Sequence, residues 1–160
     1  MAVYERSVLV DAPFEEVWAF HSRVSGLEAL TPDWMHLHIE AVRGPDGDPD
    51  PDILETGSTI ESSVRPFDVG PRQRWISYIA TRREGDGEAM FRDEMTRGPF
   101  PHWVHTHRFE ATPDGTRVHD RVEYRLPGGP LGRLVGPLGV VGFEPMFRYR
   151  HRRTKELLEP

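Results

Sequence analysis

Hydrophobic and polar residues alternate most regularly in two neighbouring segments, 101–112 and 116–126. Side chains of a β-strand point alternately to its two faces, so each segment is predicted to be a strand with one mainly apolar face. That face holds Trp103, His105, His107 and Phe109 in the first strand, and Val118, Asp120, Val122 and Tyr124 in the second. Burying a polar group is costly unless it is hydrogen-bonded. The two histidines and the aspartate are therefore the first candidates for a functional role.

The same patterns predict a chain rich in strands, with helices near both ends. Residues 3–10 are predicted to form the first strand. A helix that begins near Pro13 and contains Phe14, Val17, Trp18 and His21 follows, and after Gly26 comes a second short helix over 27–30. Four further strands are predicted over 36–42, 57–65, 72–83 and 88–97. Because short turns join most of the strands, they are predicted to form an antiparallel meander.

The C-terminal part of the chain is predicted to be a long helix over 143–159, with Pro145 in its first turn. The side predicted to face the sheet includes Phe143, Met146, Phe147 and Arg150. The preceding segment, 131–143, is apolar but rich in glycine and proline, and is predicted to be too broken for a regular helix. Residues 129–142 are expected to act as a mobile lid.

These elements indicate an α+β fold for residues 1–160, expected to be one domain. A curved antiparallel sheet of about seven strands would wrap around the long C-terminal helix, with two short helices after the first strand. No other predicted element is long enough to cover the open face of the sheet. Sheet and helix would then enclose an internal cavity.

Composition narrows the classes of function. The net charge of -6 argues against a general nucleic-acid binder. No apolar run is long enough to span a bilayer, and the N-terminus lacks the layout of a secretion signal, so we expect a cytoplasmic protein without stable membrane insertion. Cysteine is absent, which excludes disulfides and thiolate chemistry. The basic stretch Arg148–Arg153 is expected to be a solvated helix face, with a membrane or partner patch as the alternative.

Several motifs resemble a known superfamily. The opening Val8–Trp18, VLVDAPFEEVW, is similar to the first strand and helix of START-like, or SRPBCC, proteins, which include polyketide cyclases and dehydrases. Further stretches resemble a ligand-binding SRPBCC subgroup: Phe91–Phe100, Trp103–Phe109, Asp120–Tyr124 and Leu126–Gly132. The resemblance covers nearly the whole chain. It implies the helix-grip fold with an internal apolar cavity, and it implies little about a reaction.

The candidate site is a polar cluster inside an aromatic cavity. If the strand faces all point at the long helix, the polar cluster consists of Asp93, His105, His107 and Asp120. The residues expected to contact a ligand are Trp34, Phe91, Trp103, His105, His107, Phe109, Asp120, Tyr124, Phe143 and Phe147. The cluster could be a structural network, could orient a ligand, or could carry out acid–base chemistry. A zinc ion held by His105 and His107 is the smallest of these alternatives.

The favoured hypothesis is a carrier or sensor that binds a small hydrophobic or amphipathic ligand. One alternative is an enzyme of the cyclase, dehydrase or hydrolase type that uses a His–Asp pair, with His105, His107, Asp120 and Asp93 as candidate catalytic residues. The other alternative is a membrane-surface or protein-partner module. No cofactor is expected, because the chain contains no dinucleotide or phosphate-binding motif. No nucleic acid is expected because of the charge, and no resident metal because a His-x-His pair alone is a weak signal. The sequence does not fix the ligand or the oligomeric state.

Overall fold

A computed structural model describes residues 1–160, except for the side chains at positions 133, 135 and 137. Seven antiparallel strands form one sheet in the order β1-β7-β6-β5-β4-β3-β2. Each strand begins and ends within about two residues of its predicted bounds. The strands are β1 (Ala2–Val10), β2 (His38–Arg43), β3 (Thr59–Val64), β4 (Gln73–Glu84), β5 (Glu88–Arg97), β6 (His102–Thr112) and β7 (Gly115–Arg125).

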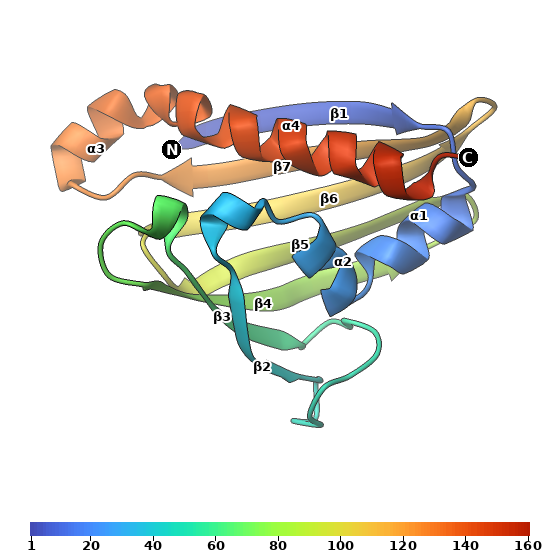
Figure 1. The fold of residues 1–160 in the computed structure, drawn as a ribbon, viewed down its shortest axis with the longest axis horizontal. Helices are drawn as coiled ribbons and strands as arrows, with labels where there is room; N and C mark the ends of the chain where they lie inside the picture. Colours follow the sequence, from blue (N-terminus) through green and yellow to red (C-terminus); the bar gives the residue numbers. More distant parts are fainter.

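The helices lie on one side of this sheet and beyond its end (Figure 1). The long helix α4 runs across β7 beside β1, and α1 and α2 lie near the C-terminal end of α4. The helices are α1 (Phe14–His21), α2 (Val24–Ala29), α3 (Gly129–Val135) and α4 (Gly139–Leu158). Three short 3-10 turns complete the set: η1 (Asp33–Met35), η2 (Pro66–Asp68) and η3 (Gly136–Leu138). The predicted α+β helix-grip architecture is confirmed.

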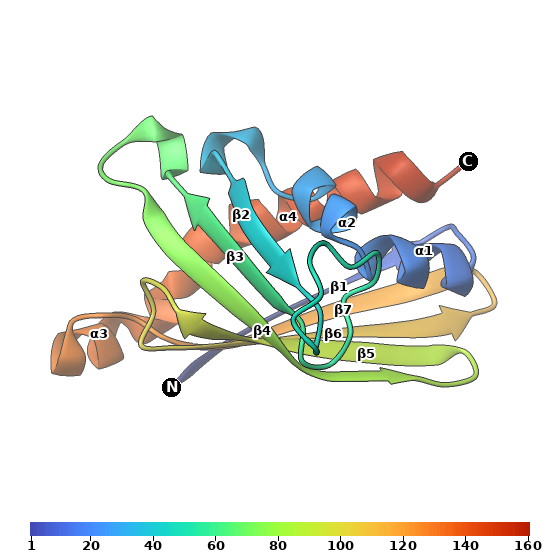
Figure 2. The same ribbon diagram turned by 90° about the horizontal axis from the view of Figure 1, so that it is seen from below.

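The sheet is strongly curved, which gives α4 a concave face to cover. Figure 2 shows β2, β3 and β4 bending away from the plane of the other strands, toward the side that carries α4. Two register shifts between β4 and β5, at Ile76/Ser77 and Ile79/Thr81, lie in the bending region. Extra residues of this kind bend a strand and increase its twist. The curvature separates β3 and β4 from the helix and leaves room between them.

The segment before the long helix differs from its prediction. Residues 131–143 are not one regular helix, as predicted, but they are helical in three pieces: α3 ends at Val135, η3 follows, and α4 begins at Gly139. Pro145 therefore lies inside α4 and not in its first turn. Tertiary contacts with β7 account for the difference. The Tyr124 hydroxyl donates a 2.8 Å hydrogen bond to the Gly136 carbonyl, and the Tyr124 ring lies directly against Gly139. A side chain at position 139 would meet that ring, so glycine permits the close approach.

Gly26 also has a role that the sequence pattern missed. It lies inside α2 rather than between the two short helices. A Cβ atom at this position would come within 2.2 Å of the Phe20 carbonyl oxygen, so only glycine allows α1 and α2 to pack this closely. The close packing brings α2 over the sheet, where Leu27 and Leu30 face the interior.

Buried side chains form three apolar clusters on the concave side of the sheet. One lies under α1 around Trp18, Phe109 and Val118. The second lies under α4 around Tyr4, Trp103, Val122, Tyr124 and Phe147, and the third includes Val42, Ile60 and Ile79. Among the described residues, no helix is both long and apolar enough to cross a membrane.

Candidate functional site

The polar cluster lies on three adjacent strands, and the strand register brings its members together. Asp93 on β5 stands opposite His105 on β6, and His107 on β6 stands opposite Asp120 on β7. Asp120 and both histidines are buried, as are Trp103 and Phe109 on the same face of β6. The predicted alternation of β6 and β7 therefore holds, and the predicted faces point toward α4.

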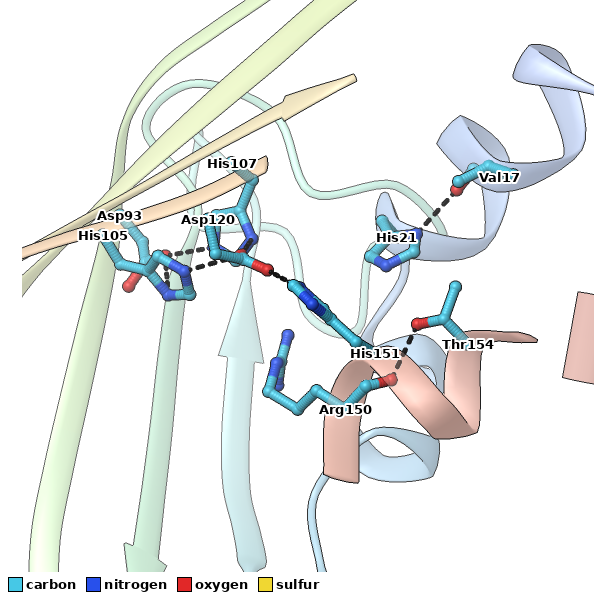
Figure 3. Close-up of polar contacts among 9 residues, drawn as sticks. All are labelled: Val17, His21, Asp93, His105, His107, Asp120, Arg150, His151 and Thr154. Atoms are coloured by element: carbon cyan, nitrogen blue, oxygen red, sulfur yellow. Dashed lines mark hydrogen bonds and ion pairs between the residues drawn. The ribbon is translucent and has the colours of Figure 1, made fainter. Parts of the chain in front are cut away.

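The two histidine rings lie against each other between the two carboxylates (Figure 3). Their ring centroids are 3.6 Å apart. On one side, His105 Nε2 is 2.8 Å and His107 Nδ1 is 3.0 Å from Asp120 Oδ1. On the other side, His107 Nε2 is 3.0 Å and His105 Nδ1 is 3.9 Å from Asp93 Oδ2. Each imidazole thus presents one nitrogen to each carboxylate.

Helix α4 adds two residues to this cluster. His151 Nε2 lies 2.6 Å from Asp120 Oδ2, and the Arg150 side chain extends toward the cluster from the same turn (Figure 3). Within the described part of the chain, the Arg150 guanidinium has neither an ion pair within 4.0 Å nor a hydrogen bond. The prediction that Arg148–Arg153 is a solvated face is therefore wrong for His151, which is buried, while Arg148 and Arg152 are exposed and pair with glutamates.

The spacing along α4 contained a signal for His151. Phe147, His151 and Thr154 are buried and follow helical intervals of four and three residues. The basic composition of the surrounding stretch concealed this pattern. The Arg150 side of the helix faces the sheet as predicted, but sequence reasoning assigned it no function. The alternative role of the tail as a membrane or partner patch stays a prediction.

The protonation states follow from burial and hydrogen bonding. Burial opposes ionisation of Asp120, but hydrogen bonds from His105, His107 and His151 outweigh it and hold its pKa well below the ordinary value. The pKa of Asp93 is likewise lowered, because the hydrogen bond from His107 and the nearby positive charges outweigh burial. Both aspartates are therefore carboxylates, which can only accept hydrogen bonds.

The two histidines differ in their affinity for a proton. Burial and the positive charge of His107 lower the pKa of His105 despite its bond to Asp120. For His107, burial also favours the neutral ring, but contacts with both carboxylates raise its pKa above the ordinary value. An additional proton on this pair therefore resides on His107. The two imidazoles are inequivalent, and His107 is the stronger base.

The cluster forms one part of the wall of a partly open cavity with a volume of about 490 Å³. This is a size typical of sites for small organic ligands. The cavity lies between α4, α2 and the strands β3 to β6. Seven of the ten residues predicted to contact a ligand line it: Trp34, Phe91, Trp103, His105, His107, Phe143 and Phe147. Asp93 lines it as well.

The other three predicted ligand-contact residues lie behind the wall. Asp120 is covered by His105, His107 and His151, to which it is bonded. The Phe109 ring packs against Trp18 and Phe91 under α1, and Tyr124 packs against Phe143 while its hydroxyl binds the Gly136 carbonyl. Strand alternation selects the concave face correctly, but it does not tell which part of that face other side chains cover.

Sequence reasoning did not assign several residues of the cavity to the site. Ser62 and Ser77 on β3 and β4 line it, and Arg150 lines it from α4. The Trp75 indole N–H donates to the Ser77 hydroxyl at 3.2 Å, and the Ser62 hydroxyl donates to the Trp75 carbonyl at 3.0 Å. The alternation Ile60, Ser62, Val64 was the available signal, although serine on such a face has no obvious functional meaning by itself.

The donor atoms at the cluster also have the composition of a metal site. Asp93, His105 and His107 each offer one ligand atom, and these three atoms lie within 4.8 Å of one another. The arrangement can therefore exchange protons, donate hydrogen bonds to a ligand, or hold a cation.

Comparison with known families identifies the fold family. Residues 1–159 match the family model described as polyketide cyclase/dehydrase and lipid transport. The chain belongs to this family. The START-like, or SRPBCC, resemblance of its motifs is thereby confirmed. A search of the curated proteins gives no match.

Solved structures of members of this fold superpose over nearly the whole chain. A protein from Chromobacterium violaceum aligns with a TM-score of 0.67 and 13% identity, over 99% of this chain and 97% of its own. A protein from Arthrobacter aurescens aligns with a TM-score of 0.67 and 17% identity, over 99% and 87%. A point mutant of norcoclaurine synthase from Thalictrum flavum, solved with a transition-state analogue, aligns with a TM-score of 0.65 and 15% identity, over 98% and 96%. At these identities, the similarity shows the fold alone.

Proposed function

We propose that the protein binds a small amphipathic molecule in the cavity between the sheet and α4, and acts as a carrier or sensor of that molecule. The observation that supports this most strongly is the cavity of about 490 Å³, which has aromatic walls and a cluster of charged side chains at one place on its surface. A folded chain that filled this space with its own side chains would be better packed. An unfilled apolar space of this size favours a ligand.

The aromatic part of the wall suits a ring-containing or aliphatic body. Trp75, Phe100 and Trp103 form a group with ring centroids 5.1–5.9 Å apart, and Phe143 of α4 contacts both Phe100 and Trp103. Aromatic faces and edges supply large contact areas with little loss of side-chain freedom. Burial of an apolar body here contributes about 25 cal/mol for each Å² removed from water.

The polar part of the wall suits an anionic or carbonyl group. The Arg150 guanidinium lines the cavity and has no ion pair among the described residues, and His107 is the basic imidazole of the cluster. A carboxylate, sulfonate or phenolate on the ligand would gain a charge-assisted hydrogen bond from Arg150. The family description, which includes lipid transport, is consistent with an amphipathic ligand.

Fluorescence titration with N-phenylnaphthylamine, an uncharged hydrophobic probe, tests the proposal. Gly142 is exposed at the edge of the cavity on α4 and has no atoms within 4 Å of where a Cβ would lie, so Gly142→Trp places an indole at this edge, where it can obstruct the cavity. The adjacent Val141 is exposed and does not line the cavity, and Val141→Trp is the matched control. We expect saturable binding by wild type and by the control, and strong loss in Gly142→Trp. Equal binding by both variants, or no binding by wild type, would contradict the proposal.

Acid–base catalysis is a second candidate, favoured by one specific observation. His107 lines the cavity, is bonded to Asp93 at 3.0 Å and carries the raised pKa of the pair, which are the properties of a general acid–base. A compound found to bind in the cavity would be incubated with wild type and with His107→Gln. Conversion by wild type alone, with binding retained in the variant, supports catalysis. Equal conversion by both proteins excludes His107 from that role.

A further inference from the structure

We propose that Asp93, His105 and His107 form a binding site for a divalent transition-metal ion, with Asp120 as the outer carboxylate that orients His105. The proposal rests on the geometry of the cluster and does not depend on the proposed organic ligand. It adds a second, inorganic site at the surface of the same cavity.

The distances are close to those that a metal ion requires. His107 Nε2 is 3.0 Å and His105 Nδ1 is 3.9 Å from Asp93 Oδ2, and all three ligand atoms lie within 4.8 Å of one another. Ligand atoms bound tetrahedrally to one zinc ion at about 2.0–2.2 Å are separated by roughly 3.3–3.6 Å. Small rotations of the two side chains of β6 would therefore bring all three atoms onto one ion.

The orientation of His105 supports the proposal as well. Asp120 Oδ1 lies 2.8 Å from His105 Nε2 and 3.0 Å from His107 Nδ1, and a carboxylate can only accept hydrogens. Asp120 therefore selects the His105 tautomer with hydrogen on Nε2, whereas His107 Nδ1 lies close to Asp120 without an aligned hydrogen bond. The lone pair of His105 then resides on Nδ1, which faces Asp93, and His107 turns its Nε2 toward the same carboxylate. Carboxylates that fix the far nitrogen of ligating histidines in this way are a usual feature of metal sites.

Asp120 is itself held firmly in place. Its other oxygen, Oδ2, accepts a 2.6 Å hydrogen bond from His151 Nε2 on α4. Asp120 and His151 are both buried, so neither carboxylate oxygen is free to turn toward the cavity. The outer carboxylate is thus fixed by the helix, while Asp93, on the cavity side, keeps an oxygen available for an ion.

The charge of the cluster also favours a cation. Two carboxylates face three histidines and Arg150, so one negative charge is uncompensated when all three histidines are neutral. A divalent ion held by Asp93, His105 and His107 would compensate this charge. The extra positive charge would then attract an anionic or hydroxide ligand.

The donor set indicates which ions fit. Two imidazoles and one carboxylate favour Zn²⁺, Co²⁺ or Fe²⁺ over Mg²⁺ and Ca²⁺, which prefer oxygen ligands. Because Asp93, His105 and His107 all line the cavity, the remaining coordination positions would open toward it. Three protein ligands with an open position are typical of reactive rather than purely structural sites.

Calorimetric titration with ZnCl₂ tests the proposal, and the chain supplies its own control. His36 and His38 form an exposed His-x-His pair outside the cavity, which would be the natural place for adventitious binding. We expect one zinc ion per wild-type chain, a loss of affinity of at least about a hundredfold in Asp93→Asn, and unchanged affinity in His38→Gln. The proposal would be overturned if wild type does not bind zinc, or if Asp93→Asn keeps the zinc affinity of wild type, whether or not His38→Gln loses it.

A measurement on the wild-type protein avoids any folding defect of the variants. With CoCl₂, proton NMR should show two strongly shifted, exchangeable imidazole N–H signals, from His105 Nε2 and His107 Nδ1. A cobalt complex without two such signals would overturn the ligand assignment. Binding of N-phenylnaphthylamine, measured separately with and without zinc, reports on the organic site and keeps failure of one proposal distinct from failure of the other.

Discussion

His151 on α4 donates a 2.6 Å hydrogen bond to Asp120 on β7. Both side chains are buried, and this bond is the polar connection between the long helix and the centre of the polar cluster. Because Asp120 also contacts His105 and His107, the position of α4 and the orientation of the two cavity imidazoles are linked through one carboxylate. The packing of the fold and the chemistry of the site therefore depend on the same residue.

Replacing this carboxylate should destabilise the protein strongly. Asp120→Asn removes the charge that accepts hydrogen bonds from His105 and His151, and its amide hydrogens would face those donors. We expect a loss of about 3 kcal/mol or more in the free energy of unfolding. Urea denaturation followed by circular dichroism measures it. Asp114→Asn, in the exposed turn before β7, is the matched control, and equal stability of the two variants would disprove the central role of Asp120.

Stability should also depend on pH through His21. Burial lowers the pKa of His21 to about 4, and its Nδ1–H donates to the Val17 carbonyl at 2.8 Å. Between pH 6.5 and about 4, the unfolded chain binds a proton at this position that the folded chain does not bind, so stability falls as the pH is lowered through this window. At about 1.4 kcal/mol per pH unit, the total effect is on the order of 3 kcal/mol.

The variant His21→Leu isolates this effect from the other titrating groups. The lowered pKa values of Asp93 and Asp120 contribute stability above pH 4 that is lost as the pH falls through their folded values. His107, with a raised pKa, contributes below pH 6.5 and loses its contribution as the pH rises. The contributions of Asp93, Asp120 and His107 to the pH dependence are retained in His21→Leu. Its unfolding free energy should therefore vary less between pH 4 and 6.5, whereas exposed His38→Leu should follow wild type. An unchanged profile in His21→Leu would refute the assignment.

Replacing two glycines of α4 by alanine should change the stability of the protein in opposite directions. At Gly142, no atom lies within 4 Å of the added methyl group, so Gly142→Ala should stabilise the helix by about 0.5–1 kcal/mol. At Gly139, the methyl group would lie 2.7 Å from the buried Tyr124 ring, so Gly139→Ala should be destabilising. Thermal unfolding compares the two. Equal gains in both variants would show that Tyr124 does not restrict the start of α4.

Arg150 should determine the charge preference of the cavity. Arg150→Met keeps the apolar stem and removes the guanidinium. We expect about tenfold weaker binding of the anionic probe anilinonaphthalene sulfonate, which corresponds to about 1.4 kcal/mol, and unchanged binding of N-phenylnaphthylamine. Arg152→Met, an exposed position on the same helix, is the control. If Arg150→Met and Arg152→Met bind the anionic probe equally, Arg150 is not the anchor.

The sheet could be predicted from sequence because alternation is a local property. The period of two placed His105 and His107 on one face, and turn residues indicated the meander from β3 to β7, but not the pairing of β1 with β7. Contacts between the helix and the sheet were harder to predict, since they depend on the rotation of α4 about its axis relative to β7. His151 was therefore grouped with its exposed basic neighbours, although Phe147 and Thr154 on the same side are buried.

The glycine-rich segment shows why local helix propensity did not predict the start of α4. Residues 131–143 have weak helix propensity, yet the hydrogen bond from Tyr124 to Gly136 and the close approach at Gly139 supply tertiary support that no local pattern reveals. Ser62 and Ser77 face the cavity for a similar reason. Their position depends on the curvature of the sheet at the register shifts of β4 and β5, which alternation alone does not predict.

Native mass spectrometry tests ligand binding in the cavity most directly. Wild-type protein, freshly purified or incubated with N-phenylnaphthylamine, should carry one organic molecule per chain that is lost on denaturation, and Gly142→Trp should carry none. A wild-type protein that shows only the mass of its bare chain under both conditions would contradict the account.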